Sequence, residues 1–257
     1  MTDCISNNIP FSIGIVGHNR TRMTIENLKL LMQYIKYPNI KFFIGSDRSR
    51  NGHIKAIDAF MKTTSYQYEC IETTSDRYGL GAIMNMVCEK VFEFSQYIML
   101  IENDMLIHRP LDVIPYIEIL NNTNVGCVSF KCYSEQMHKC KSSFYEINGN
   151  KYCIPIPLTS ESYAIDFGQN ILSKRLYEKL GKFIENTNET DMVEKTFAMA
   201  YVKQLQEPTS IIKVIPYEYL HDMMNDNKGV FYHVGIHSQH SNAVWNPTLI
   251  PQCYHNL

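Results

Sequence analysis

The chain has 257 residues, of which 45% are hydrophobic and 19% are charged, and its formal net charge is −2. This length and composition suit one large globular domain and exclude a disordered chain, a collagen-like repeat and a coiled coil. The near balance of charge gives no reason to expect a nucleic acid partner, and no apolar run approaches the ~20 residues of a membrane span.

The start of the chain and its cysteines both indicate a cytoplasmic protein. Residues 1–10 contain neither the basic segment nor the apolar core of a secretory signal. The 8 cysteines are thinly spread, whereas disulfide scaffolds are shorter and richer in cysteine, so we expect reduced thiols. Four residues, Cys132, His138, Cys140 and Cys153, could bind zinc, but they lack the paired spacing of a zinc finger, and buried thiols are the favoured alternative.

Strand-like and helix-like segments alternate through the first hundred residues. Short apolar runs indicate strands, and apolar residues at spacings of three and four indicate helices. The expected strands are 12–17, 40–45, 66–72 and 97–101, and the expected helices are 21–35, 53–62 and 80–94. This alternation predicts an α/β fold with a mostly parallel sheet, right-handed crossovers and helices on both faces.

The second half of the chain is less regular. Its expected elements are strands at 125–130 and 211–215 and helices at 171–184 and 191–205, with an irregular stretch at 133–160. The sequence contains no internal repeat, low-complexity tract or clear linker. We therefore expect a single domain over 1–257, made of an alternating half at about 11–130 and an irregular half at about 131–257.

Polar residues follow each of the first four expected strands. These polar ends are Gly17-His18-Asn19-Arg20, Ser46-Asp47-Arg48, Thr73 to Asp76, and Glu102-Asn103-Asp104. In a parallel sheet the carboxyl ends of the strands share one edge, and ligands of α/β proteins bind there. Loops are polar in any protein, so a single polar end would indicate little. Four such ends at one edge predict a binding site.

The most informative end is Glu102-Asn103-Asp104, which directly follows an apolar strand. Two carboxylates at positions i and i+2 lie on the same side of an extended chain and repel each other unless a cation neutralises them. Hard oxygen ligands of this kind suit Mg2+ or Mn2+ carrying a diphosphate. A solvated turn is the alternative interpretation of so short a motif.

In these motifs and in their order, the chain resembles the GT-A glycosyltransferases, especially the family-2-like nucleotide-diphospho-sugar transferases. The matching segments, within residues 11–205, are FSIGIVGHNR (11–20), Ser46-Asp47-Arg48-Ser49, RYGLGAIMN (77–85), Glu102-Asn103-Asp104 in place of an Asp-x-Asp motif, and LSKRLYEKLGKF (172–183) followed by Glu189-Thr190-Asp191. Two features depart from the family. The triplet begins with glutamate, and the nucleoside loop has one aspartate, Asp47, where many relatives have two.

The resemblance implies a metal-dependent, inverting glycosyltransferase with a GT-A-like fold. It would move a hexosyl or pentosyl group from a nucleotide-diphosphate sugar to a glycan or other hydroxyl acceptor, with Mn2+ or Mg2+ as cofactor. Residues 11–130 would bind the donor and residues 131–257 the acceptor. Two other classes stay open: a sugar nucleotidyltransferase, although the loop at 17–20 is short and not glycine-rich, and a non-catalytic nucleotide- or carbohydrate-binding module.

The resemblance also implies a set of metal ligands. Asp104 would bind the metal directly, and Glu102 would help to hold the metal or the ribose. A histidine from the tail is expected as a third ligand, with His233 and His237 as candidates. They share a face of an extended segment, so their spacing does not separate them. We favour His233, because Gly235 would let the backbone approach the diphosphate.

Five further residues are implied at the nucleotide sugar. Asp47 would accept hydrogen bonds from the nucleoside, Asn103 would contact the ribose, and His18 and Arg20 would line the same pocket. Arg77 could face the diphosphate, and a surface arginine is the equal alternative.

Asp191 matches the catalytic base of the family. A carboxylate within hydrogen-bond reach of the acceptor hydroxyl can take its proton as the hydroxyl attacks the anomeric carbon. A base opposite the leaving group implies in-line displacement and inversion. The alternative is a residue at a helix N-terminus favoured by the helix dipole, and Glu189 is the nearest competing candidate.

Overall fold

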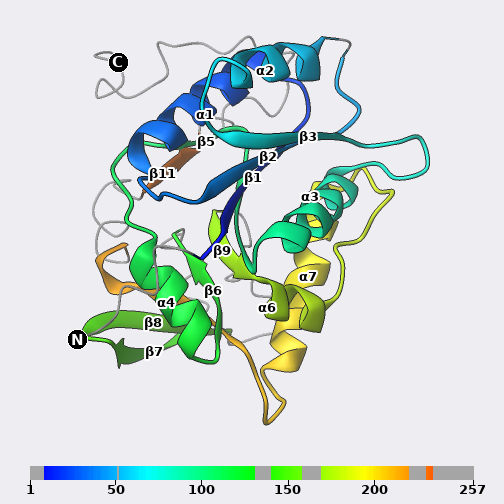
Figure 1. Ribbon diagram of the computed structural model, residues 1–257. Helices are drawn as coiled ribbons and strands as arrows, with labels where there is room; N and C mark the ends of the chain where they lie inside the picture. Colours follow the sequence, from blue (N-terminus) through cyan, green and yellow to red (C-terminus); the bar gives the residue numbers. More distant parts are fainter. Residues whose placement is uncertain (1–8, 51, 131–139, 158–168, 220–229, 234–257) are drawn as a thin grey trace.

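The computed structural model describes residues 9–50, 52–130, 140–157, 169–219 and 230–233 (Figure 1). In chain order its elements are β1 (Phe11–Gly17), α1 (Thr21–Tyr34), β2 (Ile40–Ser46), α2 (His53–Met61), β3 (Gln67–Glu72), α3 (Leu80–Phe94), β4 (Tyr97–Glu102), β5 (Met105–Ile107), α4 (Ile114–Asn122), β6 (Val125–Ser129), β7 (Cys140–Ile147), β8 (Asn150–Pro157), β9 (Asn170–Ser173), α6 (Lys174–Leu180), α7 (Thr190–Gln204), β10 (Ile212–Pro216) and β11 (Phe231–His233).

The first four strands form the parallel sheet that the alternating pattern predicts. β1 pairs in parallel with both β2 and β4, and β2 pairs in parallel with β3. The register places Gly17 beside Ser46 and Val16 beside Glu102, so that the polar ends of these strands begin at one edge of the sheet. The four strands and three helices expected in the first hundred residues are confirmed.

The second half extends the same sheet. The strand order is β3-β2-β1-β4-β9-β6-β10-β8-β7, and β9 runs antiparallel to both of its neighbours, β4 and β6. Because β9 is antiparallel to both β4 and β6, β6 runs in the same direction as β4. β10 is parallel to β6. The carboxyl ends of β6 and β10 therefore lie at the same edge as those of β1, β2 and β4.

Two expectations for the second half are wrong. The helix expected at 171–184 is a strand, β9, followed by the short helix α6, which ends before Gly181. β9 is buried between two strands, and a short, fully buried apolar run has no periodicity that separates a strand from a helix. The stretch 133–160, expected to be irregular, contains the β7–β8 hairpin. Its Pro155 lies beyond Tyr152 and Cys153, the residues at which β8 pairs with β10, so the ring removes no bond of that ladder.

The sheet is covered by helices on both faces, as expected (Figure 1). One face packs against α1, α2 and α4 through a core that includes Leu28, Ile57 and Ile117. The other packs against α3, α6 and α7. In the part of the chain that the structure describes, no helix has the length and apolar character needed to cross a membrane.

Candidate functional site

The turn between β1 and α1 forms the centre of the candidate site. Asn19 and Arg20 both have positive φ angles, 54° and 62°, a conformation that asparagine tolerates better than most residues. The Asn19 amide N–H donates to Ser49 Oγ at 2.7 Å, and Asn19 Oδ1 accepts from the Arg50 N–H at 2.8 Å. These bonds join the turn after β1 to the loop after β2.

The Asn103 side chain holds this turn through hydrogen bonds. Its side chain is buried, and Nδ2 donates to the Asn19 carbonyl oxygen at 3.1 Å and to Thr24 Oγ1 at 3.3 Å. A Cβ added at Gly17 would lie 2.3 Å from Asn103 Cγ, so only glycine leaves room for the amide. The Asn103 amide thus holds the turn that contains Asn19, and its expected contact with a ribose stays a prediction.

Arg20 and Asp104 are brought together, as the sequence predicts, but they contact each other. Arg20 Nη1 donates to Asp104 Oδ2 in an ion pair whose side chains are 38% and 6% exposed, respectively. A nearly buried carboxylate is costly without a positive charge beside it, and the left-handed turn at Arg20 brings that charge within reach. The Arg20 guanidinium thus compensates the charge of the Asp104 carboxylate just after β4.

A segment from the far end of the chain also reaches Asp104. β11 pairs antiparallel with β5, and its register sets His233 opposite Met105, the residue that follows Asp104. Directly opposed residues of an antiparallel pair have Cα atoms about 4.5–5.5 Å apart. The backbone of the favoured tail histidine therefore lies beside the acidic triplet, in which Glu102 is half-buried.

Several predicted ligands lie outside what the structure describes. His237, Cys132 and His138 are outside the described residues, and so are the side chains of His233 and Cys140. Among the side chains that are described, no group of three or more His, Cys, Asp or Glu residues could hold a metal ion.

Asp47 links four segments at the strand ends. Its Oδ1 accepts from Thr73 Oγ1 at 3.0 Å and from the Gly79 N–H at 2.9 Å, and its own N–H donates to the Gly17 carbonyl oxygen at 2.9 Å. His18 Nδ1 lies 2.5 Å from the Asp47 carbonyl oxygen. Asp47, which we expect to bind the nucleoside, thus also holds the loops after β1, β2 and β3 to the start of α3. The exposed His18 ring lies against the Asp47 backbone.

The sequence pattern did not single out Arg48 and Tyr78 as site residues, although both lie in the motifs that carry the resemblance. The Arg48 guanidinium lies 4.4 Å from the centre of the Tyr78 ring, and Arg48 Nη2 donates to Asn188 Oδ1 at 2.9 Å. Arg48 follows β2, Tyr78 precedes α3 and Asn188 precedes α7. A local sequence pattern could not join three segments so far apart in the chain.

For Arg77 the structure is consistent with the alternative of a surface arginine, since the side chain is 32% exposed and its guanidinium pairs with carboxylates of the protein. The guanidinium makes four hydrogen bonds, of 2.6–3.2 Å, to the carboxylates of Glu89 and Glu185. Lys182 adds a bond of 2.7 Å to Glu89. Because its donors bind protein carboxylates, we do not retain Arg77 as a contact of the diphosphate.

The segment between α6 and α7 lies directly on the start of α3. Asn85 donates to the Phe183 carbonyl oxygen at 2.9 Å and accepts from the Phe183 N–H at 2.9 Å. The Asn186 N–H donates to the Tyr78 carbonyl oxygen at 3.0 Å. These contacts hold the beginning of α7 near the carboxyl ends of the strands. Asp191 lies in the first turn of α7, and its side chain is outside the described part.

A comparison with solved structures finds glycosyltransferases. The mannosyltransferase PcManGT from Pyrobaculum calidifontis, in complex with GDP-Man and Mn2+, has a TM-score of 0.54 at 13% identity, covering 80% of this chain and 54% of that chain. S. aureus TarS in complex with UDP-GlcNAc has a TM-score of 0.55 at 11% identity, covering 80% and 56%. GalNAc-T7 with UDP, GalNAc and Mn2+ has a TM-score of 0.55 at 12% identity, covering 81% and 42%.

These likenesses confirm the expected fold class: the chain has a GT-A-like α/β fold with a largely parallel sheet. At identities of 11–13% they show the fold alone. The chain spans about half the length of the solved proteins it matches, between 42% and 56%. No protein-family model matches the sequence, and no curated protein matches it.

Proposed function

We propose that the chain is a metal-dependent, inverting glycosyltransferase that moves a hexosyl or pentosyl group from a nucleoside-diphosphate sugar to a hydroxyl acceptor. The observation that carries the proposal is the nearly buried Asp104 carboxylate at the end of β4, with a cationic partner and with β11 beside it. It occurs in a fold whose solved examples bind GDP-Man and UDP-GlcNAc.

The residues at the end of β4 fit a divalent cation. The carboxylates of Asp104 and Glu102 are hard oxygen donors of the kind that Mn2+ and Mg2+ accept, and an imidazole from His233 would suit the transition metal Mn2+ better than Mg2+. The 38% exposure of the Arg20 side chain leaves it room to turn away when another cation takes its place. Bound there, the ion would neutralise charge that builds on the departing diphosphate.

The donor would be held by the neighbouring loops. Asp47 is fixed by two hydrogen bonds to its Oδ1, which makes the loop after β2 a rigid wall for the nucleoside. Arg48 and Tyr78 stack on each other in the same region and would face the base. Arg20, once released from Asp104, and the exposed His18 would face the phosphates.

Asp191 would act as the base. Its place in the first turn of α7 stabilises a carboxylate in its charged form, and the charged form is the one that accepts a proton. Deprotonation of the acceptor hydroxyl by a base on the face opposite the diphosphate leads to inversion at the anomeric carbon.

Calorimetry and a donor panel test the proposal together. We expect GDP or UDP to bind only with Mn2+ present, and Asp104→Asn to weaken that binding by at least about tenfold. The matched control is Glu26→Gln, which removes an exposed carboxylate of α1 paired with Lys29 and should change nothing. Asp191→Asn should keep nucleotide binding and lose transfer to the acceptor.

Three results would contradict the proposal. Nucleotide binding that ignores both a chelator and the Asp104→Asn substitution would reject the metal site. Release of pyrophosphate from a nucleoside triphosphate would indicate a nucleotidyltransferase instead. Donor binding by the wild type without hydrolysis or transfer to any acceptor would indicate a non-catalytic binding module.

A further inference from the structure

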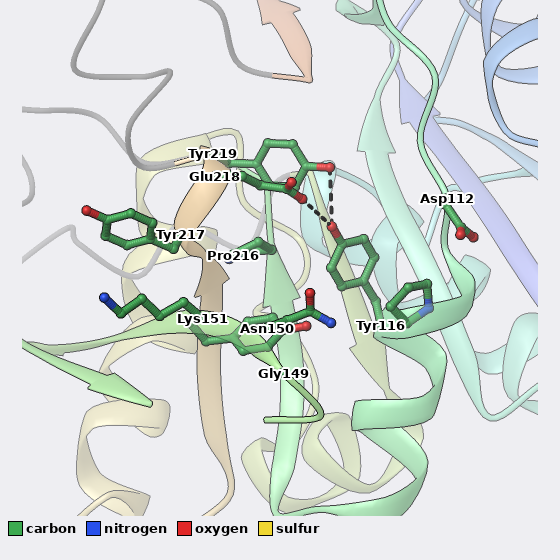
Figure 2. A pocket seen from close by; sticks show the side chains of 11 residues that line it. Asp112, Tyr116, Gly149, Asn150, Lys151, Pro216, Tyr217, Glu218 and Tyr219 are labelled. Atoms are coloured by element: carbon green, nitrogen blue, oxygen red, sulfur yellow. Dashed lines mark hydrogen bonds between the residues drawn. The ribbon is translucent and has the colours of Figure 1, made fainter. Parts of the chain in front are cut away.

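A pocket lies farther along the same edge of the sheet, among elements that carry none of the proposed donor loops. Its volume is about 390 Å3, and it is bounded by the start of α4, the β7–β8 turn and the segment after β10 (Figure 2). Pro216 ends β10, which runs parallel to β6, so the pocket lies at the carboxyl edge. Its volume falls within the ~300–1,000 Å3 that small-molecule sites typically have.

Tyrosine rings form much of the pocket. Tyr116, Tyr152 and Tyr219 are buried, whereas Tyr217 is 40% exposed. The Lys151 ammonium lies 5.2 Å from the centre of the Tyr217 ring, and both side chains extend along one side of the pocket (Figure 2). An exposed ring packs against apolar C–H groups, and a neighbouring polar tip can bond to hydroxyls. A sugar ring has both kinds of group.

The opposite side of the pocket holds fixed polar groups. The Tyr116 hydroxyl donates to Glu218 Oε1 at 3.0 Å and lies 3.2 Å from the Tyr219 hydroxyl (Figure 2). Burial raises the pKa of Tyr219 to about 12, and burial also raises the pKa of Tyr116. Both phenols therefore keep their protons at neutral pH. Because the single Tyr116 proton is donated to Glu218, this side offers the Glu218 carboxylate as an acceptor and the Tyr219 hydroxyl, both in fixed positions.

The charges of the lining favour a neutral ligand. Lys151 brings one positive charge, whereas Asp112 and Glu218 bring two negative charges, so the lining residues are negative overall. The Arg109 guanidinium, 5.2 Å from the centre of the Tyr219 ring, adds a second positive charge close by, so the pocket offers a phosphate or a nucleotide no excess of positive charge. Asn150, at the β7–β8 turn, adds an amide that can both donate and accept.

One aromatic cluster connects this pocket to the acidic end of β4. The Phe130 ring lies 5.2 Å from that of Tyr116, 5.6 Å from that of Tyr219 and 6.3 Å from that of Phe231. Phe231 begins β11, the strand that pairs beside Met105. The pocket and the segment next to Asp104 therefore share one packed core, which gives the two sites a fixed relative position.

We propose that this pocket binds a neutral sugar ring of the acceptor, an inference that rests on the proposed glycosyltransferase function. Tyr217 supplies the stacking face, and Glu218, Asn150 and Lys151 bind the hydroxyls. The acceptor is then a glycan with uncharged residues, held some distance along the edge from the donor loops.

Saturation-transfer NMR with neutral trisaccharides tests this inference on the full chain. The probes are maltotriose, cellotriose, mannotriose and triacetylchitotriose. We expect the wild type to bind at least one of them, Tyr217→Ala to weaken that binding by at least about tenfold, and Tyr217→Phe to retain it because the ring remains. Tyr145→Ala is the control, because Tyr145 is 53% exposed on the same hairpin and does not line the pocket.

The outcomes separate this inference from the proposed function. Failure of the wild type to bind any of the four trisaccharides, or equal binding by Tyr217→Ala and Tyr145→Ala, would overturn the pocket. Calorimetry of Mn2+ and nucleotide with the same variants reports on the donor site alone, and we expect no change. Trisaccharide binding that depends on Tyr217, in a protein without nucleotide binding, would keep the pocket and reject the transferase.

Discussion

The substitution Gly81→Ala tests how closely the 183–187 segment packs against the first turn of α3. Gly81 lies in the first turn of α3, and a Cβ there would be 1.8 Å from the Ile184 carbonyl oxygen. Contacts of a Cβ below 3.0 Å are essentially never found, so in Gly81→Ala the 183–187 segment must retreat by about 1.2 Å, the difference between the two distances. That segment leads into α7 and Asp191.

The two effects of the substitution have opposite signs. Alanine is favoured over glycine inside a helix by about 1 kcal/mol. Crowding in a packed region costs about 1–3 kcal/mol, and we take the upper end because the neighbour is backbone and cannot rotate away. The net loss is about 2 kcal/mol, which for a chain of this size lowers Tm by about 4–8 °C. A shift of about 1 Å at a reacting group can reduce a rate about 100-fold.

Thermal denaturation and transfer assays on Gly81→Ala check both numbers. We expect Tm to fall and transfer to fall by about 100-fold, while Mn2+-dependent nucleotide binding is retained. The control is Gly52→Ala, where the φ of 96° strains alanine by about 1–2 kcal/mol but no atom lies within 4 Å of the new Cβ. It should lose stability and keep transfer. A Gly81→Ala variant as stable as the wild type would refute the close approach of the segment to α3.

Two further predictions concern groups away from the donor. Arg77→Ala should lower stability by about 1–2 kcal/mol, because it removes two partly exposed ion pairs worth up to about 1 kcal/mol each, and should leave nucleotide affinity unchanged. The hydrogen bond from Arg77 lowers the pKa of Glu185, so this stability is present above the ordinary carboxyl pKa of ~4.3 and is lost as pH falls through the lower folded value. Urea titrations at pH 7 and pH 3 should therefore show the difference between wild type and Arg77→Ala shrinking with acid, and a constant difference would contradict the pairing. Burial raises the pKa of Cys70 to about 11 and also raises that of Cys88. Mass spectrometry after iodoacetamide at pH 8 should find Cys88 unmodified in the native protein and Cys70 modified far more slowly than in denaturant, whereas rapid native labelling of Cys88 would show that it is not buried.

Local pattern was sufficient for the alternating half of the chain, residues 11–130. Strands of that half are apolar runs that end in polar residues, and helices between them carry apolar stripes, so period and strand ends predicted the parallel sheet and the edge at which Asp47 and Asp104 both lie. The same reasoning failed at β9, because a strand buried on both faces has no period to detect.

Only the tertiary structure decided which of the candidate side chains are engaged by other parts of the protein. Arg77 is paired with Glu185, 108 residues away, and Asn103 is buried beneath the turn that contains Asn19. The register of β11 sets His233 beside Met105, and the pocket around Tyr217 gathers residues from α4, β8 and the end of β10. Such partners are chosen by packing and by the pairing of charges across distant segments, and no local pattern of residues encodes that choice.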